Sequence, residues 1–227
     1  MTFRSIGISL GIAVVLLGAS ALITRNAASA SVAIAAPVAD DSLAAQSGQE
    51  TAVVAGGCFW GIQLVFEHVK GVISATDGYS GGDARTAQYE TVSTGTTGHA
   101  ESVKIVYDPS QITYGKLLQV FFSVATDPTE LDRQGPDEGT QYRSVVFYAN
   151  EDQQRIAEAY IAQLDQEHVF RDKIVTEVVP FKAFYQAEAY HQDYAVNNPD
   201  STYIMMYDAP KLDNLRKKFP ELYVKYR

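Results

Sequence analysis

The spacing of apolar residues predicts alternating strands and helices from residue 51 onward. Residues 51–55 form a short β-rich run, and after a glycine turn residues 59–69 become apolar at helical spacing, at Ile62, Val65, Phe66 and Val69. Residues 72–79 and 103–107 are typical of two further strands, each ended by a turn sequence. The first half of this region is therefore predicted to run strand, helix, strand, strand.

The second half continues the pattern. Thr113 can cap a helix that extends to Phe122, and Asn150 with Gln153 three residues later is a capping-box pattern. A polar loop over 127–143, strands at 144–149 and 174–179, and an irregular, aromatic-rich tail complete the prediction. The order β-α-β-β-α-β, with a further helix and strand, indicates the α+β class. It is typical of a two-layer ferredoxin-like sandwich with an antiparallel sheet.

The N-terminal region has a different character. Arg4 precedes an apolar stretch over 6–23, and a small-residue pattern ends at Ala30, as in a secretory signal peptide. The alternative is a retained membrane anchor through residues 6–23. Residues 31–50 show neither period and are predicted to be a flexible tether, which leaves 51–227 as the catalytic domain. We expect an exported protein, periplasmic or otherwise extracytoplasmic.

Composition narrows the classes of partner. The chain has 227 residues and a formal net charge of −9, which argues against nucleic acid because that partner requires clustered Lys and Arg. The length suits one globular domain, and we expect a monomer.

Cys58 is the only cysteine, so an internal disulfide is impossible and the thiol is either inert or chemically active. It follows the glycine pair at 56–57, where a helix is predicted to begin. Backbone N–H groups and the helix dipole at that position favour a thiolate. The adjoining Phe59 and Trp60 could receive a small apolar group. A strand-turn-helix with small residues is also compatible with packing alone.

Several sequence blocks occur together with this cysteine: Gly57-Cys58-Phe59-Trp60-Gly61, Gly78-Tyr79-Ser80-Gly81-Gly82, Tyr89-Glu90-Thr91-Val92, Gly98-His99-Ala100-Glu101, Val106-Tyr107-Asp108-Pro109, Arg133-Gln134-Gly135-Pro136-Asp137, Gly139-Thr140-Gln141-Tyr142-Arg143-Ser144 and Ala187-Glu188-Ala189-Tyr190-His191-Gln192-Asp193-Tyr194. In these blocks, and in their order, the chain resembles the A-type peptide-methionine sulfoxide reductases over about residues 51–200. The resemblance implies reduction of the S epimer of methionine sulfoxide, free or within oxidised proteins.

The resemblance also implies roles for seven residues. Cys58 attacks the sulfoxide sulfur and becomes a sulfenic acid, while Glu101 supplies a proton, which requires a raised carboxyl pKa. The remaining roles are hydrogen bonds to the sulfoxide oxygen from Tyr89 and Tyr142, a methyl pocket from Phe59 and Trp60, and orientation of Tyr142 or of water by Asp137.

The four histidines show no metal-ligand spacing, so we expect neither a metal nor another cofactor. His68 is ten positions from Cys58 and too distant to assist it, His168 is expected at the surface, and His99 and His191 are expected to be structural. Two alternatives to the reductase remain open from the residues. One is an acyl transferase or amidase that pairs Cys58 with His99. The other is a protein that binds a sulfoxide or thioether without turnover.

The chain departs from many relatives in having no second cysteine near its C-terminus. A Cys58 sulfenic acid would therefore need an external thiol, from a thioredoxin-like or glutaredoxin-like protein or a small molecule. A second departure is Thr126, where relatives usually have histidine.

Overall fold

The computed structural model describes residues 34–225, within a compact unit that runs from Ser31 to Arg227. The predicted signal peptide or anchor, residues 1–30, lies outside the described residues and stays a prediction. Within residues 34–225, no helix combines the length and the apolar character needed to cross a membrane.

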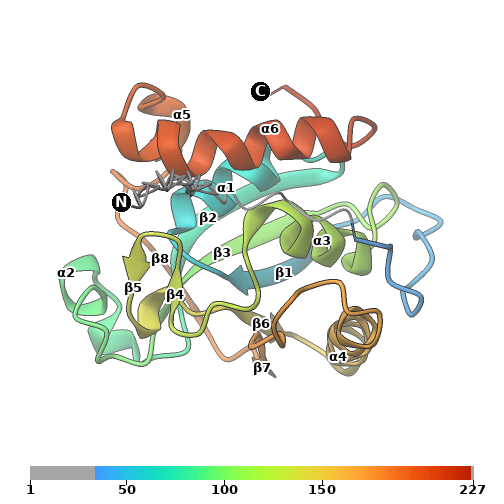
Figure 1. The fold of residues 1–227 in the computed structure, drawn as a ribbon, viewed down its shortest axis with the longest axis horizontal. Coiled ribbons are helices and arrows are strands. Elements are labelled where there is room, and N and C mark those ends of the chain that lie inside the picture. The colour runs from blue at the N-terminus through green and yellow to red at the C-terminus, as the bar shows by residue number, and fades with distance from the viewer. Residues whose placement is uncertain (1–33, 226–227) are drawn as a thin grey trace, which may run out of the picture. The chain divides into compact units, whose positions relative to one another are not determined.

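A six-stranded sheet occupies the middle of this unit (Figure 1). In spatial order its strands are β7 (Glu177–Pro180), β6 (Val145–Tyr148), β1 (Glu50–Ala55), β3 (Ala100–Tyr107), β2 (Val72–Ser80) and β8 (Phe184–Gln186). Neighbouring strands are antiparallel except β6 and β7, which are parallel. The α+β class is confirmed, but the expectation of an antiparallel sheet is wrong at this edge. The chain returns from β6 through a helical crossover, which brings β7 alongside in the same direction. The ferredoxin-like arrangement stays a prediction.

Strand β1 lies in the interior of the sheet, between β6 and β3, and both of its faces are buried. Ala52 and Val54 belong to the main core, while Val53 and Ala55 pack with a second cluster that includes Phe147 on the opposite face. A strand buried on both faces has no polar alternation, which explains why residues 52–55 are continuously apolar.

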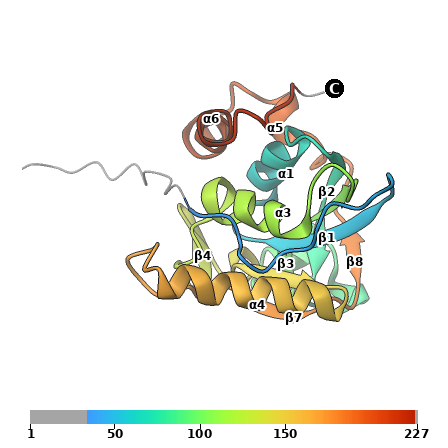
Figure 2. The same cartoon turned by 90° about the vertical axis from the view of Figure 1, so that its right-hand side faces the viewer.

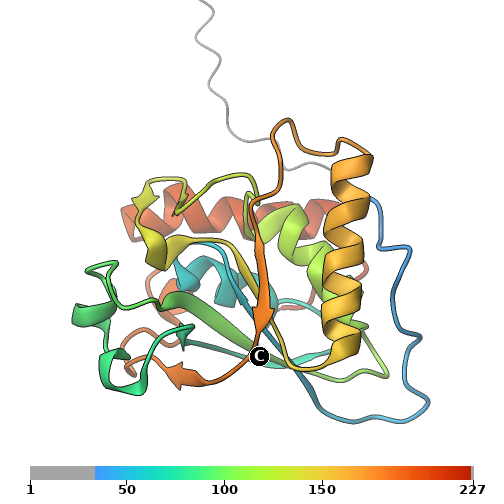
Figure 3. The same ribbon diagram turned by 90° about the horizontal axis from the view of Figure 1, so that it is seen from below.

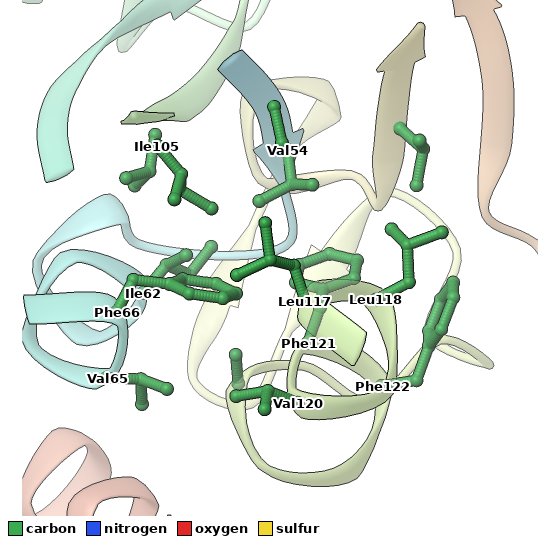
Figure 4. Close-up of a cluster of buried hydrophobic side chains, with 14 of the residues drawn as sticks. Val54, Ile62, Val65, Phe66, Ile105, Leu117, Leu118, Val120, Phe121 and Phe122 are labelled. Carbon is green, nitrogen blue, oxygen red and sulfur yellow. The ribbon is translucent and has the colours of Figure 1, made fainter. Parts of the chain in front are cut away.

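The main core lies between the sheet and the helices α1 (Phe59–Glu67) and α3 (Tyr114–Val120), as Figure 4 shows. Ile62, Val65 and Phe66 are fully buried, as their spacing predicted, and each such side chain contributes about 1.5–3 kcal/mol by leaving water. Thr113 caps α3 by accepting a hydrogen bond from the backbone N–H of Lys116, 3.2 Å away. Beyond α3 the chain continues in a wider π-helical turn, Phe121–Ala125.

Helix α4 (Glu151–Gln166) begins as predicted, because the side chain of Asn150 accepts from the backbone N–H of Gln153 at 2.8 Å. It packs beside α3 and against β6 and β7 (Figures 2 and 3).

The expectation of an irregular C-terminal tail is wrong. The tail contains the short helix α5 (Tyr194–Asn197), a π-helical turn η4 (Ile204–Asp208) and the ten-residue helix α6 (Ala209–Lys218). Helix α6 lies on the far side of α1 from the sheet (Figures 1 and 2). Its apolar pattern is weak, since Leu215 is its only buried residue, so its sequence does not carry a strong helical period.

The predicted tether differs from the expectation where the structure describes it. Residues 34–48 run along the catalytic unit, and Glu50 already belongs to β1. The backbone oxygen of Ala35 accepts from the hydroxyl of Tyr160 at 2.7 Å, and the Asp40 carboxylate accepts from the N–H of Gly115 at 2.9 Å. These contacts attach the segment to α4 and to the start of α3.

Candidate active site

A pocket of about 210 Å³ opens where β1 passes into α1. Its lining contains all seven predicted site residues and one that was not predicted, Tyr203: Cys58, Phe59, Trp60, Tyr89, Glu101, Asp137, Tyr142 and Tyr203. The lining residues come from β3, α1, α2 (Tyr89–Val92), the short strand β5 (Asp137–Glu138), the 3-10 turn Thr140–Tyr142 and the C-terminal tail. The fold thus brings together groups that are far apart in the sequence.

The glycine turn places Cys58 at the start of α1, as its N-cap residue rather than within the first turn. Gly57 has φ +104°, a conformation that favours glycine, and a Cβ there would come within 2.5 Å of the Gln134 side chain. Gln134 in turn donates to the hydroxyl of Thr126 at 3.0 Å, and Thr126 packs on Gly56. Thr126, the departure from the usual histidine, therefore helps to hold the turn that carries the sulfur.

The protonation state of Cys58 differs from the expectation. Its side chain is 8% exposed, and burial raises the pKa of the thiol well above its ordinary value. The charges of Glu101 and Asp208 raise it further, while a backbone hydrogen bond from Trp60 and the charge of Lys211 oppose the shift. The helix start does favour a thiolate, as predicted, but desolvation and the nearby carboxylates raise the pKa of the thiol by more than the helix start lowers it.

Glu101 lies on β3 with 2% exposure, and its Oε2 accepts from the backbone N–H of Phe59 at 3.2 Å. Burial raises its pKa to about 8, although the Phe59 N–H favours the charged form; Asp137 adds to the increase. The carboxyl is therefore protonated at neutral pH, as an acid catalyst requires.

Two tyrosines line the same pocket. Burial raises the pKa of both Tyr89 and Tyr142, which keeps the hydroxyls protonated and able to donate. Glu188 holds Tyr89 in place by accepting its backbone N–H at 3.0 Å.

Asp137 has a hydrogen-bond partner that the sequence did not predict. Its carboxylate accepts a hydrogen bond from the hydroxyl of Tyr203 and not from Tyr142. Sequence reasoning missed Tyr203 because its position depends on the path of the tail over α1. The only signal in the sequence was the density of tyrosines after residue 189.

Comparison with known proteins identifies one family to which this chain is similar. Residues 50–223 match the family described as peptide methionine sulfoxide reductase. A relative from Mesorhizobium japonicum, peptide methionine sulfoxide reductase MsrA 2, is 58% identical over 79% of this chain and 92% of its own. MsrA of Pasteurella multocida is 47% identical over 77% of this chain and 98% of its own.

The chain belongs to the peptide methionine sulfoxide reductase family. The solved structure of methionine sulfoxide reductase A of Corynebacterium diphtheriae is similar, with a TM-score of 0.58, 37% identity, and coverage of 68% of this chain and 77% of that one. The family resemblance stated from the sequence blocks is therefore confirmed, and the chain is an A-type reductase.

In this reductase the aromatic residues that line the pocket are held in place by residues of the C-terminal segment. The ring of Trp60 stacks on Tyr194 at 3.9 Å, and its Nε1 donates to Nδ1 of His191 at 3.2 Å. His191 is 2% exposed and also packs against Phe59 and Tyr89, with ring centroids 5.0 and 4.5 Å apart. His191 was expected to be structural, and its contacts show that it supports three pocket residues at once.

The alternative that pairs Cys58 with His99 lacks a free base. Nδ1 of His99 accepts from the N–H of Gly82 at 3.2 Å, which leaves Nε2 to donate to the carbonyl of Asp83 at 3.0 Å. Both ring nitrogens are therefore engaged, and His99 is absent from the pocket lining.

No group of three or more His, Cys, Asp or Glu side chains is placed to hold a metal ion in the described part of the reductase. The need for no metal stays a prediction.

Proposed function

We propose that the reductase converts the S epimer of methionine sulfoxide, free or within oxidised proteins, to methionine through Cys58. The observation that carries the proposal is the meeting of one thiol, one protonated carboxyl and two tyrosine hydroxyls in a small aromatic pocket. A sulfoxide sulfur becomes electrophilic only when its oxygen is hydrogen-bonded or protonated, so thiol and acid must act together.

In the first step Cys58, having lost its thiol proton to water, forms a bond from its sulfur to the sulfoxide sulfur while Glu101 gives its proton to the oxygen. Tyr89 and Tyr142 donate to that oxygen as negative charge develops on it. The hydroxyl then transfers from the substrate sulfur to the Cys58 sulfur as the S–O bond of the substrate and the bond between the two sulfurs break, so that Cys58 becomes a sulfenic acid and methionine leaves. The rings of Phe59 and Trp60 surround the methyl group, which orients the sulfur towards Cys58.

The second step requires two thiol groups from outside the chain, because Cys58 is its only cysteine. One thiol attacks the sulfenic acid and releases water, and the second displaces Cys58 from the resulting mixed disulfide. We propose a thioredoxin-like or glutaredoxin-like protein, or a small thiol, as this reductant. No prosthetic group takes part in either step.

The test combines turnover with a single-turnover measurement. With dithiothreitol as reductant, wild type should reduce the S epimer and not the R epimer, and Cys58→Ser should be inactive. Without reductant, wild type should release one methionine per chain and gain one oxygen on Cys58, seen by mass spectrometry. Full activity of Cys58→Ser would reject the nucleophile. Binding of sulfoxide without methionine release would support the binding-protein alternative instead.

Export is part of the proposal, supported by the signal-like pattern of residues 1–30. Repair of oxidised exported proteins would then be the physiological role. Fractionation of cells that express the full chain tests this, because export predicts the reductase outside the cytosolic fraction.

A further inference from the structure

A buried ion pair lies on the C-terminal tail, outside the pocket lining. The Lys211 ammonium donates to Oδ1 of Asp208 at 3.1 Å, and the Asp208 side chain is 0% exposed. Its second oxygen, Oδ2, has no hydrogen-bond partner among the described residues. Burying a charge pair costs free energy unless its electrostatic environment compensates. The pair is therefore more readily explained by a role in function than by a contribution to stability.

The pair rests directly on the first turn of α1. A Cβ at Gly61 would come within 2.6 Å of the Lys211 ammonium and would also collide with the Asp208 carboxylate. Gly61 is three residues after Cys58, which caps the same turn. The absence of a side chain at Gly61 thus lets one cation and one anion approach the helix start that carries the nucleophile.

Both charges act on the Cys58 sulfur. Besides burial, Glu101 and then Asp208 raise the pKa of the thiol, whereas the Trp60 N–H and Lys211 lower it. Burial also raises the pKa of Asp208 itself, against the effect of Lys211. The other titratable groups that line the pocket with Cys58 are Asp137, Tyr89, Tyr142 and Tyr203.

We propose that the Asp208–Lys211 pair is a positioning element that sets the charge of Cys58, with Asp208 holding the sulfur as a thiol between turnovers and Lys211 favouring the thiolate. The inference rests on the proposed role of Cys58 as the nucleophile. It has a chemical purpose, because a thiolate with no second cysteine to trap its sulfenic acid is open to irreversible oxidation. A thiol that ionises only when substrate and acid are in place is protected.

Alkylation of the whole protein by iodoacetamide tests the proposal, because Cys58 is the only thiol that can react. Asp208→Asn leaves the cation unopposed and should speed alkylation at neutral pH about tenfold, since a nearby charge changes a protonation equilibrium by that order. Inactivation of this variant by hydrogen peroxide should accelerate in parallel. Lys211→Met should slow alkylation at alkaline pH, where Asp208 is ionised and unopposed.

The two variants are expected to change the alkylation rate in opposite directions, which separates an electrostatic effect from a change in packing. Loosened packing would expose the sulfur and speed alkylation in both variants, which would overturn the inference, as would unchanged rates. Lys211→Met is decisive alone, because loosened packing predicts the opposite sign for it. If Lys211→Met does not fold, the pH profile of alkylation decides Asp208→Asn: an electrostatic effect moves the midpoint to lower pH, whereas loosened packing raises the rate at every pH. Asp213→Asn is the matched control, because Asp213 forms an exposed pair with Arg216 at 3.4 Å on the same helix and should leave alkylation unchanged. These rates are measured without sulfoxide, so they are independent of whether Cys58→Ser abolishes reduction.

Discussion

At the residue scale, the titrations of Cys58 and Glu101 are linked because the charge of Glu101 raises the pKa of the Cys58 thiol. In the proposed mechanism the reactive state of the pair holds one proton, on Glu101, with the sulfur ionised. Below about pH 8 the pair holds two protons, so kcat/KM should rise as pH increases through about 8 and fall again when the second proton leaves. In Glu101→Gln only the thiol titrates. Its kcat/KM should be about 10²–10⁴-fold lower and should keep rising with pH. A wild-type profile that declines through neutral pH would contradict this proton assignment.

Thermal unfolding provides the control that Glu101→Gln remains folded. The folded carboxyl has a pKa of about 8 against an ordinary value of 4.5, so ionisation opposes folding. The stability associated with the neutral carboxyl is fully present below pH 4.5 and is lost as pH rises towards 8. The melting temperature of Glu101→Gln should therefore rise relative to wild type across this interval and level off above it. A constant difference would mean that Glu101 is not buried as a neutral acid.

At the element scale, the glycine turn between β1 and α1 fixes the sulfur. Gly57→Ala forces a side chain into a positive-φ conformation and against Gln134, so it should destabilise the protein by more than the usual ~1–2 kcal/mol of such a conformation. Displacement of Cys58 should lower kcat/KM roughly a hundredfold. Gly135→Ala is the control, because Gly135 has φ +56° and a Cβ at this position would meet nothing within 4 Å beyond its own chain neighbours. It should lose stability through the backbone alone and keep its activity. Urea unfolding and steady-state kinetics measure both effects.

The turn before α1, helix α6 and strand β8 show which parts of the fold and of the site could be predicted from the sequence. Cys58, Phe59 and Trp60 were found because a turn and a helix start are local features, and Glu101 because its sequence block resembles that of the family. Helix α6 was missed because its packing on α1 buries only Leu215, and β8 because three residues carry no measurable alternation. Tyr203 depends on how that helix returns over α1, which no local pattern encodes.

At the scale of the whole catalytic unit, the composition of the segment before β1 predicted a flexible tether. In the structure, residues 34–48 of this segment instead bond to partners that are far away in the sequence. Most of the apolar residues among 34–48 are alanines, which carry little side chain to bury, yet Ile34 is buried and its carbonyl accepts from Gln119 at 3.0 Å. Ser47 likewise donates to Asp108 at 2.7 Å. Such backbone and side-chain hydrogen bonds leave no periodic signal, so a segment of small and polar residues that packs is indistinguishable in sequence from one that does not.

Asp40 tests whether this segment stabilises the unit without taking part in catalysis. Its carboxylate accepts from the Thr113 hydroxyl and from the Gly115 N–H, so it helps to cap α3, and none of its partners lines the pocket. Asp40→Ala should cost about 0.5–2 kcal/mol of unfolding free energy, as loss of a helix cap does, with kcat/KM unchanged. The neighbouring Asp41→Ala removes only an exposed pair with Arg155 at 3.4 Å and should change stability by less than about 1 kcal/mol. Equal effects of the two substitutions in urea unfolding would show that the segment is not anchored through Asp40, because only Asp40 has partners in the helix cap.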